Sequence, residues 1–217
     1  MDRSRLAIVI PAYNEEKTIS SVVKGVVPFG MPIVVDDGSK DGTACIAASE
    51  GAVVVSHEQN RGYDEALNSG FEKAFQLEVE IVMTFDADGQ HSSELIDQFL
   101  VAIDGGADVV IGNRNRRARF TEVIFSWVAR KLWQIEDPLC GMKAYRIEVY
   151  KALGHFDSYE SIGSELCIFA AKKNRPIAQV SFEVKDRSDL PRLGNLWSSN
   201  LKIIRALLLG ILRQQKH

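Results

Sequence analysis

The sequence is poor in cysteine, has no long apolar run and carries no excess of positive charge. Three cysteines, Cys45, Cys140 and Cys167, lie far apart, a pattern that favours neither a disulfide framework nor a zinc site and fits a reducing compartment. No apolar stretch reaches the roughly 20 residues that a membrane-spanning helix requires. The 26 basic and 29 acidic residues give a net charge of -3, so no basic field attracts nucleic acid. We therefore expect a cytoplasmic protein that does not bind nucleic acid.

What the sequence does contain is a regular succession of short apolar runs and helix-like segments. Apolar residues make up 46% of the chain, enough for one large core, and the length fits a single domain over residues 1–217. The runs are continuous rather than alternating, which predicts an α/β fold with a mostly parallel central sheet covered by helices on both faces. The expected strands are residues 6–10, 32–35, 52–55, 81–83, 108–111 and 177–184. The expected helices are residues 15–27, 43–50, 64–77, 92–103, 120–133 and 161–173.

Two carboxylates, Asp86 and Asp88, follow the apolar run at 81–83. Strand side chains alternate between faces, so both carboxylates lean the same way if the chain stays extended through Ala87. Two like charges about 4 Å apart repel by about 4 kcal/mol at an effective dielectric near 20, and nothing in a core requires them. A hard divalent cation with an anion beyond it explains the pair, and Gln90 offers that cation a neutral oxygen. The alternative is a solvated turn, since Asp and Gly favour turns.

Two more polar clusters follow predicted strands. Residues 11–15 follow the first strand, and Asp36 and Asp37 follow the second. Because the carboxyl ends of parallel strands share one edge of a sheet, we expect these clusters to lie beside Asp86 and Asp88. Glu15 also fits the role of an acidic residue at a helix start, and Asp36 and Asp37 that of a capped turn.

Five segments, taken in order, resemble the family-2 glycosyltransferases of GT-A fold, and within them the dolichol- and polyprenyl-phosphate sugar transferases. The resemblance covers about residues 5–200 and implies transfer, with inversion, of a sugar from a nucleoside-diphosphate sugar. It divides the domain into a nucleotide-sugar-binding half at about 1–112 and an acceptor half at about 113–195. The five segments are Pro11-Ala12-Tyr13-Asn14-Glu15-Glu16, residues 34–43, Asn60-Arg61-Gly62-Tyr63, residues 86–91 and Gly112-Asn113-Arg114.

The resemblance also implies roles for individual residues. Asp86 and Asp88 are the expected catalytic residues and, with Gln90, the expected ligands of Mg²⁺ or Mn²⁺. Contacts to a UDP- or GDP-linked donor are expected from Pro11, Tyr13, Glu15, Asp36, Asp37 and Arg114. Arg187 and Arg192 lie in a late loop where the family grips phosphates of the donor or the lipid. The chain departs from the branch at Asp64-Glu65, where two glycines are usual, and at Pro138-Leu139-Cys140-Gly141, where a serine often precedes the glycine.

The C-terminal segment, residues 196–217, reads as a basic amphipathic helix. Lys202, Arg205, Arg213 and Lys216 follow one stripe of it, and leucines and isoleucines cover the rest. Such a helix suits an anionic membrane surface. The alternative is a helix that packs on the domain or on a second subunit, with its basic stripe in solvent.

These observations lead us to expect a transferase that uses a polyprenyl phosphate acceptor at the inner face of the cytoplasmic membrane. A sugar hydroxyl of a growing glycan is the alternative acceptor, and Glu165 is then a candidate base, because a hydroxyl must lose a proton and a lipid phosphate need not. A nucleotidyltransferase would carry a glycine-rich, basic loop after the first strand, where this chain has Asn14 and Glu15. A non-catalytic sugar-nucleotide binder is disfavoured by the intact pair Asp86 and Asp88. The base, the sugar and the oligomeric state are left open.

Overall fold

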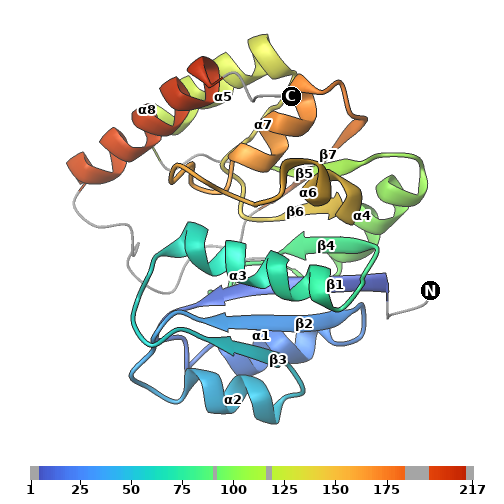
Figure 1. The fold of residues 1–217 in the computed structure, drawn as a ribbon, viewed down its shortest axis with the longest axis vertical. Helices are drawn as coiled ribbons and strands as arrows, with labels where there is room; N and C mark the ends of the chain where they lie inside the picture. The colour runs from blue at the N-terminus through green and yellow to red at the C-terminus, as the bar shows by residue number, and fades with distance from the viewer. Residues whose placement is uncertain (1–4, 90–91, 116–118, 184–195, 214–217) are drawn as a thin grey trace.

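The computed structural model describes residues 5–89, 92–115, 119–183 and 196–213. These residues form a seven-stranded sheet in the order β3-β2-β1-β4-β6-β5-β7, with helices on both faces (Figure 1). All strand pairs are parallel except those that β6 makes with β4 and β5. The strands are β1 (Leu6–Ala12), β2 (Met31–Asp36), β3 (Val53–Ser56), β4 (Ile81–Thr84), β5 (Val109–Arg114), β6 (Lys143–Arg146) and β7 (Ile177–Phe182). The helices are α1 (Ile19–Val26), α2 (Thr43–Ser49), α3 (Tyr63–Gln76), α4 (Leu95–Asp104), α5 (Phe120–Trp133), α6 (Ile147–Leu153), α7 (Glu165–Lys172) and α8 (Leu196–Leu212).

The continuous apolar strands arise because the sheet separates two hydrophobic cores. In β1, Ala7 and Val9 enter the core beneath α3, α5, α6, α7 and α8, whereas Ile8 and Ile10 enter the core beneath α1, α2 and α4. All four side chains are fully buried. Every position of a central strand therefore faces a core, which confirms the predicted α/β fold with a mostly parallel sheet.

Three expected helices, α1, α4 and α7, begin three or four residues later than their apolar spacing indicated, and one helix was not predicted. α1 starts at Ile19 because Glu15 closes a turn in which its carbonyl accepts from the backbone N–H of Thr18 and Ile19. α7 starts at Glu165 rather than at 161 because Ile162 and Gly163 adopt left-handed φ values of 58° and 68°. The unpredicted helix is α6, which directly follows β6 and ends at a left-handed glycine.

The carboxyl ends of β1, β2 and β4 lie at one edge of the sheet. The register pairs Ala12 of β1 with Asp36 of β2, and Val9 of β1 with Thr84 of β4, so these carboxyl ends lie side by side. β6 runs the other way, and its first residue, Lys143, pairs with Thr84. The turn that precedes β6 therefore arrives at the same edge. No helix in the described part of the chain is both long and apolar enough to span a membrane.

Candidate active site

Asp86 and Asp88 lie where β4 leaves the sheet. The Phe85 amide donates to the carbonyl of Val9 at 2.9 Å, which extends the pairing with β1 one residue past β4. Phe85 and Ala87 are buried, 2% and 4% exposed, whereas Asp86 and Asp88 are half-buried. This alternation supports the expectation that the two carboxylates share a side of the chain. Gly89 follows in a left-handed conformation, φ 73°, and turns the backbone away.

The turn before β6 packs directly on Asp86. A Cβ placed on Gly141 would lie 2.6 Å from Cγ of Asp86, so a larger residue at 141 would displace the carboxylate. Thr84 fixes the turn: its hydroxyl donates to the carbonyl of Gly141 at 2.6 Å and accepts from the Lys143 amide at 3.1 Å. The second of the two segments that depart from the family pattern thus forms one wall around the first carboxylate.

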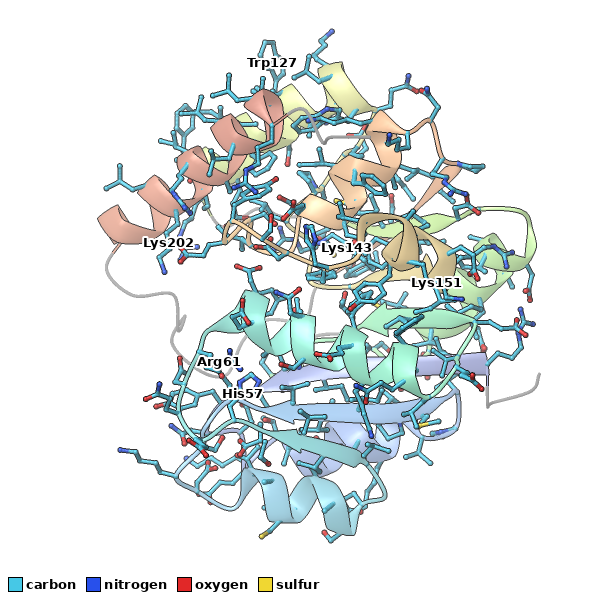
Figure 2. The ribbon with its side chains drawn as sticks, in the orientation of Figure 1. His57, Arg61, Trp127, Lys143, Lys151 and Lys202 are labelled. Carbon is cyan, nitrogen blue, oxygen red and sulfur yellow. The ribbon has the colours of Figure 1, made fainter. Side chains whose placement is uncertain are left out.

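Lys143 is a buried cation behind this wall (Figure 2). Its ammonium donates to the carbonyls of Cys140 at 2.6 Å and Gly163 at 3.0 Å. It therefore ties the turn before β6 to the loop before α7. Burial raises the pKa of the Cys140 thiol to about 12, so this thiol stays protonated and is no nucleophile at neutral pH.

Tyr63, the first residue of α3, shares the electrostatic environment of Asp86. Tyr63 as a residue is 38% exposed, but desolvation of its phenol, followed by the charges of Asp86 and Asp64, raises the pKa of the phenol above its usual value. The phenol is therefore a hydrogen-bond donor at neutral pH. A Cβ on Gly163 would meet the Tyr63 ring at 3.4 Å, so the loop before α7 also reaches this side of the site.

Asp36 and Asp37 follow β2 and are both buried. Asp36 accepts from the Ser39 amide at 3.3 Å. Asp37 accepts from the backbone amides of Arg61 and Gly62, each at 2.8 Å, and thereby holds the motif that precedes α3. Both carboxylates therefore have a structural role in these loops, as the capped-turn alternative proposed. Their expected contact with a nucleoside stays a prediction.

His57 and Ser69 complete the surroundings of Asp37 and were not singled out from the sequence. His57 Nδ1 lies 2.7 Å from Asp37 Oδ1, and Nε2 lies 2.9 Å from the Ser69 hydroxyl. His57 and Arg61 come from the loop that joins β3 to α3 (Figure 2), and the His57 amide donates to the carbonyl of Asp36, the last residue of β2, at 2.9 Å. The twelve-residue separation of His57 from Ser69 across a loop gives no local sequence signal.

The end of β1 and the segment that follows it carry Pro11, Tyr13 and Glu15. Pro11 pairs with Val35 inside the sheet, and Tyr13 is 39% exposed at the edge. Between Tyr13 and Glu15, Asn14 adopts a left-handed φ of 54°, and its side-chain oxygen accepts from the Lys40 amide at 2.9 Å. The first two motifs are therefore joined by hydrogen bonds at the sheet edge, as their places after β1 and β2 predicted.

Glu15 is buried, and its amide donates to the Thr43 hydroxyl at 2.8 Å. Its carboxylate accepts from the Thr18 hydroxyl at 2.9 Å. Glu15 lies four residues before the first residue of α1, so it belongs to the turn ahead of the helix rather than to the helix itself.

Arg114, the last residue of β5, is held by Asp137. Its Nε and Nη2 donate to the two oxygens of Asp137 at 2.7 and 3.0 Å, and Nη2 also lies 3.5 Å from Glu122. Burial alone lowers the pKa of this guanidinium, but the bond to Asp137 and the neighbouring carboxylates outweigh it and raise the pKa above its usual value. The structure thus gives Arg114 a bidentate protein partner, and its expected phosphate contact stays a prediction.

Comparison with known proteins decides the family. The family model "Glycosyl transferase family 2" matches residues 7–132, more than half of the chain and all of the elements from β1 to α5. The chain belongs to glycosyl transferase family 2. The matched residues include every strand end described above except the turn before β6.

Several relatives of this family-2 chain have named activities. The UDP-N-acetylglucosamine–dolichyl-phosphate N-acetylglucosaminyltransferase of Methanococcus voltae is 30% identical over 203 residues, 77% of this chain and 80% of that protein. The dolichyl-phosphate hexose transferase of Haloferax volcanii is 30% identical over 201 residues, 87% of this chain and 86% of that protein.

A solved structure of similar fold is glucosyl-3-phosphoglycerate synthase from Mycobacterium tuberculosis in complex with Mg²⁺ and UDP. It matches with a TM-score of 0.75 and 28% identity, over 94% of this chain and 78% of that one. The similarity supports the GT-A fold that the sequence motifs implied.

Glu165 is the candidate base for a hydroxyl acceptor, and both oxygens of its carboxylate accept hydrogen bonds. It is 2% exposed, and its carboxylate accepts from the Ser158 amide at 2.5 Å and the Ser158 hydroxyl at 3.0 Å. His155 Nε2 lies 3.2 Å from it. Three further residues that the sequence proposed, Gln90, Arg187 and Arg192, lie outside the described residues.

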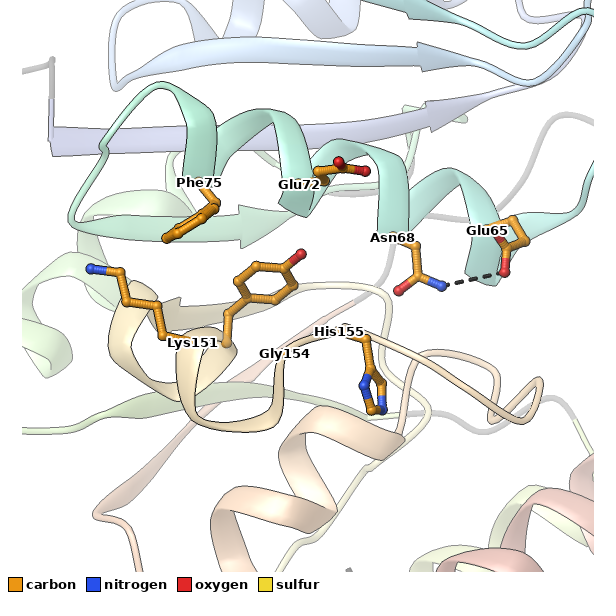
Figure 3. A pocket seen from close by; sticks show the side chains of 8 residues that line it. Glu65, Asn68, Glu72, Phe75, Lys151, Gly154 and His155 are labelled. Atoms are coloured by element: carbon orange, nitrogen blue, oxygen red, sulfur yellow. Dashed lines mark hydrogen bonds between the residues drawn. The ribbon is translucent and has the colours of Figure 1, made fainter.

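A cavity of about 640 Å³ opens between α3 and α6, away from the strand ends (Figure 3). None of the residues expected to bind the donor or the metal lines it. Its described lining consists of Glu65, Asn68, Glu72, Phe75, Tyr150, Lys151, Gly154 and His155.

Proposed function

We propose that this family-2 glycosyltransferase moves a sugar from a nucleoside-diphosphate sugar to a polyprenyl phosphate, with inversion, at the cytosolic face of a membrane. The observation that carries the proposal is the pair Asp86 and Asp88 at the carboxyl end of β4, leaning to one side and walled by Gly141. Relatives named for dolichyl-phosphate transfer cover more than three quarters of the chain, which supports the acceptor class.

The carboxylate pair suits a divalent cation shared with a diphosphate. Among the described residues no cluster of three or more His, Cys, Asp and Glu side chains forms a complete metal site. Mg²⁺ is typically held by one or two carboxylates together with substrate phosphates, so two carboxylates are sufficient when a donor is bound. Asp86 and Asp88 are the proposed ligands, with Gln90 as a third. The chemistry that Mg²⁺ or Mn²⁺ would supply is neutralisation of the leaving diphosphate.

The protein's own residues would bind and orient the donor. Pro11 near the end of β1, Tyr13 and Glu15 after it, Asp36 at the end of β2 and Asp37 after it are the proposed nucleoside contacts. The Asp37 carboxylate is already held by the backbone amides of Arg61 and Gly62. Ordering this side chain would therefore cost no conformational entropy when a donor binds. Arg114, Arg187 and Arg192 are proposed phosphate contacts, Arg114 by exchanging or sharing its bond to Asp137.

The state of Glu165 favours a phosphate acceptor. Both of its oxygens are occupied by hydrogen bonds within the loop before α7, and it is buried. A phosphate monoester is ionised at neutral pH and attacks the anomeric carbon in line without a base, whereas a hydroxyl must transfer its proton as it attacks.

The proposal is tested by sugar transfer from UDP- and GDP-linked donors to a short-chain polyprenyl phosphate, with added Mn²⁺ or with a chelator. We expect one donor to give a lipid-linked sugar, and the chelator to abolish it. Transfer that proceeds equally with chelator would contradict the metal role. The absence of product with every donor, while a hydroxyl acceptor is glycosylated, would contradict the acceptor.

One observation favours a second acceptor class. The solved structures of glucosyl-3-phosphoglycerate synthase include a complex with Mn²⁺, UDP and phosphoglyceric acid, so a similar fold serves an acceptor that is not a lipid. A small hydroxyl acceptor predicts turnover that is indifferent to detergent or vesicles, and loss of turnover when Glu165 is made neutral.

A further inference from the structure

α5 and α8 lie side by side at the outside of the domain (Figure 1). Near their starts, the Thr121 hydroxyl donates to the side-chain oxygen of Asn200 at 2.7 Å. Near their ends, a Cβ on Gly210 would lie 3.5 Å from the Trp133 ring. The two helices therefore run parallel and pack one face each against the core beneath them, which leaves both outer faces next to each other.

The outer faces are unusually apolar. Of the 16 large apolar side chains that are exposed in the described residues, ten belong to these two helices. On α8 all five recur three and four residues apart, the spacing of a single helical face, and so do the first four on α5, with Leu132 beside that face. Exposed apolar residues that are scattered singly need no explanation, but a gathered set marks an interaction surface. We call the ten the docking surface: Phe120, Val123, Ile124, Trp127, Leu132, Leu201, Ile204, Leu208, Ile211 and Leu212.

Neither helix of the docking surface presents an exposed acidic side chain of its own, and the acids next to them, Glu136 and Glu160, pair with Arg130 and Arg205. α8 contains no acidic residue between Leu196 and Leu212, and the only acid of α5, Glu122, is buried and lies within 4 Å of arginines. Lys131 and Lys202 are exposed at the margins, and neither forms an ion pair with another described residue. Lys202 projects near the outer end of α8 and Trp127 at the outer edge of the molecule (Figure 2).

Two other cations of the expected basic stripe are used to fix α8 to the domain. Arg205 Nη1 donates to the Tyr159 carbonyl at 2.8 Å and lies 3.4 Å from Glu160 through the same atom. Arg213 Nη1 donates to the Ser158 hydroxyl at 2.8 Å, and its guanidinium lies 4.8 Å from the Tyr159 ring. α8 is therefore anchored to the loop before α7, and its outer face is held in a fixed direction.

We propose that the docking surface of α5 and α8 binds the surface of an anionic lipid bilayer. Its aromatic and aliphatic side chains would enter the interfacial layer, where tryptophan is favoured, while Lys131 and Lys202 meet anionic head groups. A second copy is the weaker occupant, since a two-fold contact would bring the same cations together with no acidic partner on either helix. This inference rests on the proposed function and deepens it, because it names the surface through which the protein would reach a lipid-linked acceptor. It also assigns this role to α5, whereas the sequence indicated it for α8 alone.

The test is co-sedimentation of the protein with vesicles of phosphatidylcholine alone or mixed with phosphatidylglycerol. We expect binding to the anionic vesicles, and at least a tenfold weaker binding for the double substitution Trp127→Glu with Leu208→Glu. Both side chains are more than half exposed, at 61% and 52%, so the core is untouched. Val101→Glu is the matched control, because Val101 is 64% exposed on α4, beneath the opposite face of the sheet, and should not change binding.

A second pair of variants measures the electrostatic part. Lys131→Gln and Lys202→Gln should each weaken binding to anionic vesicles about fivefold, since a cation near such a surface contributes about 1 kcal/mol. Lys73→Gln on α3 should leave it unchanged. High salt should remove the difference between wild type and the two variants.

Three outcomes would overturn the inference: no binding of the wild type to either vesicle, equal loss in Val101→Glu, or a dimer that Trp127→Glu dissociates in the absence of lipid binding. Transfer of sugar to a short-chain, water-soluble polyprenyl phosphate separates this inference from the proposed function. A variant that loses vesicle binding but still transfers sugar to this acceptor would show that the docking surface serves membrane binding and not the reaction. A protein that binds vesicles but transfers no sugar would contradict the proposed function and leave the membrane-binding inference intact.

Discussion

The two halves of the sheet edge are built by different means. At the carboxyl ends of β1, β2 and β4, each candidate side chain lies within a few residues of the end of its strand, and short loops lead into the next helix. Around β6 and α7, the edge is built from a buried polar network in which Asp157 accepts from Ser161, whose hydroxyl in turn accepts from the Glu165 amide. The first arrangement positions chemical groups, whereas the second holds one half of the domain to the other.

α3 is the link between the halves. Asp64 accepts from the amide of Gly163 at 2.7 Å, and Asn68, one turn later, accepts from the amides of Phe156 and Asp157 at 3.0 Å. The loop before α7 is thus held at both ends by one face of α3, a helix in the half that we propose binds the donor. The departure from glycine at 64 has a structural use in this chain.

The comparison predicts that a small change that disturbs the carboxylate of Asp86 should remove activity and leave stability nearly intact. Gly141→Ala should lower turnover at least about 100-fold, because the added methyl group overlaps the Asp86 carboxylate and a misplacement of about 1 Å can have an effect of that size. Steady-state kinetics together with thermal unfolding measure both effects. Gly25→Ala, within α1 and 3.3 Å from the Ser93 hydroxyl, is the control and should alter neither. Full activity in Gly141→Ala would contradict the placement of Asp86 in the site.

Around β6 and α7 we expect the opposite result, a substitution that lowers stability and leaves turnover unchanged. Glu165→Gln places an amide N–H₂ where two hydrogen-bond donors of Ser158 now meet a carboxylate, which should lower the free energy of unfolding by about 1–3 kcal/mol. Transfer to a polyprenyl phosphate per folded molecule should be unchanged. Urea unfolding and kinetics at a temperature well below the midpoint separate the two. A stable variant without turnover would instead make Glu165 a base and favour a hydroxyl acceptor.

The contacts between α3 and the loop before α7 should also respond to pH. Burial and then the nearby charge of Asp157 raise the pKa of Asp64 to about 7, against opposing hydrogen bonds from the loop amides. A carboxyl whose pKa is raised on folding keeps its proton in the native state, so its contribution to stability is complete below about pH 4 and declines as pH rises to about 7.

Asp64→Asn removes this titration. Urea unfolding of wild type and variant between pH 4 and 8 should therefore show their stability difference shifting by on the order of 4 kcal/mol, and the wild type becomes less stable relative to the variant as pH rises. A difference that is constant over this range, or one that shifts in the opposite direction, would contradict the raised pKa. Glu65→Gln, at an exposed neighbouring position, is the control.

The sequence was informative where structure is local. Continuous apolar runs predicted the strands because both faces of the sheet are covered, and polar residues after β1, β2 and β4 predicted a shared edge because parallel strands end together. The sequence was silent where partners are distant. Arg114 pairs with Asp137 across 23 residues, Asp64 with Gly163 across 99, and no period or motif signals either contact.

Exposure was equally hidden in the sequence. The apolar face of α5 has the composition of a buried helix, and only its position at the outside of the domain, beside α8, shows that Phe120 and Trp127 lie in solvent. α6 was missed because it follows β6 without an intervening loop, so its seven residues offered no separate helical period.

The most direct test of the account is the thermal stability of wild type and of Asp88→Asn with a nucleoside-diphosphate sugar, with and without Mn²⁺. A ligand at about 100 times its dissociation constant stabilises the native state by about 2.7 kcal/mol. The account predicts a Mn²⁺-dependent stabilisation by one donor in the wild type and in the control Asp97→Asn, an exposed acid of α4, and its loss in Asp88→Asn. The same stabilisation in Asp88→Asn, or one that does not depend on Mn²⁺, would contradict a donor site built on Asp86 and Asp88.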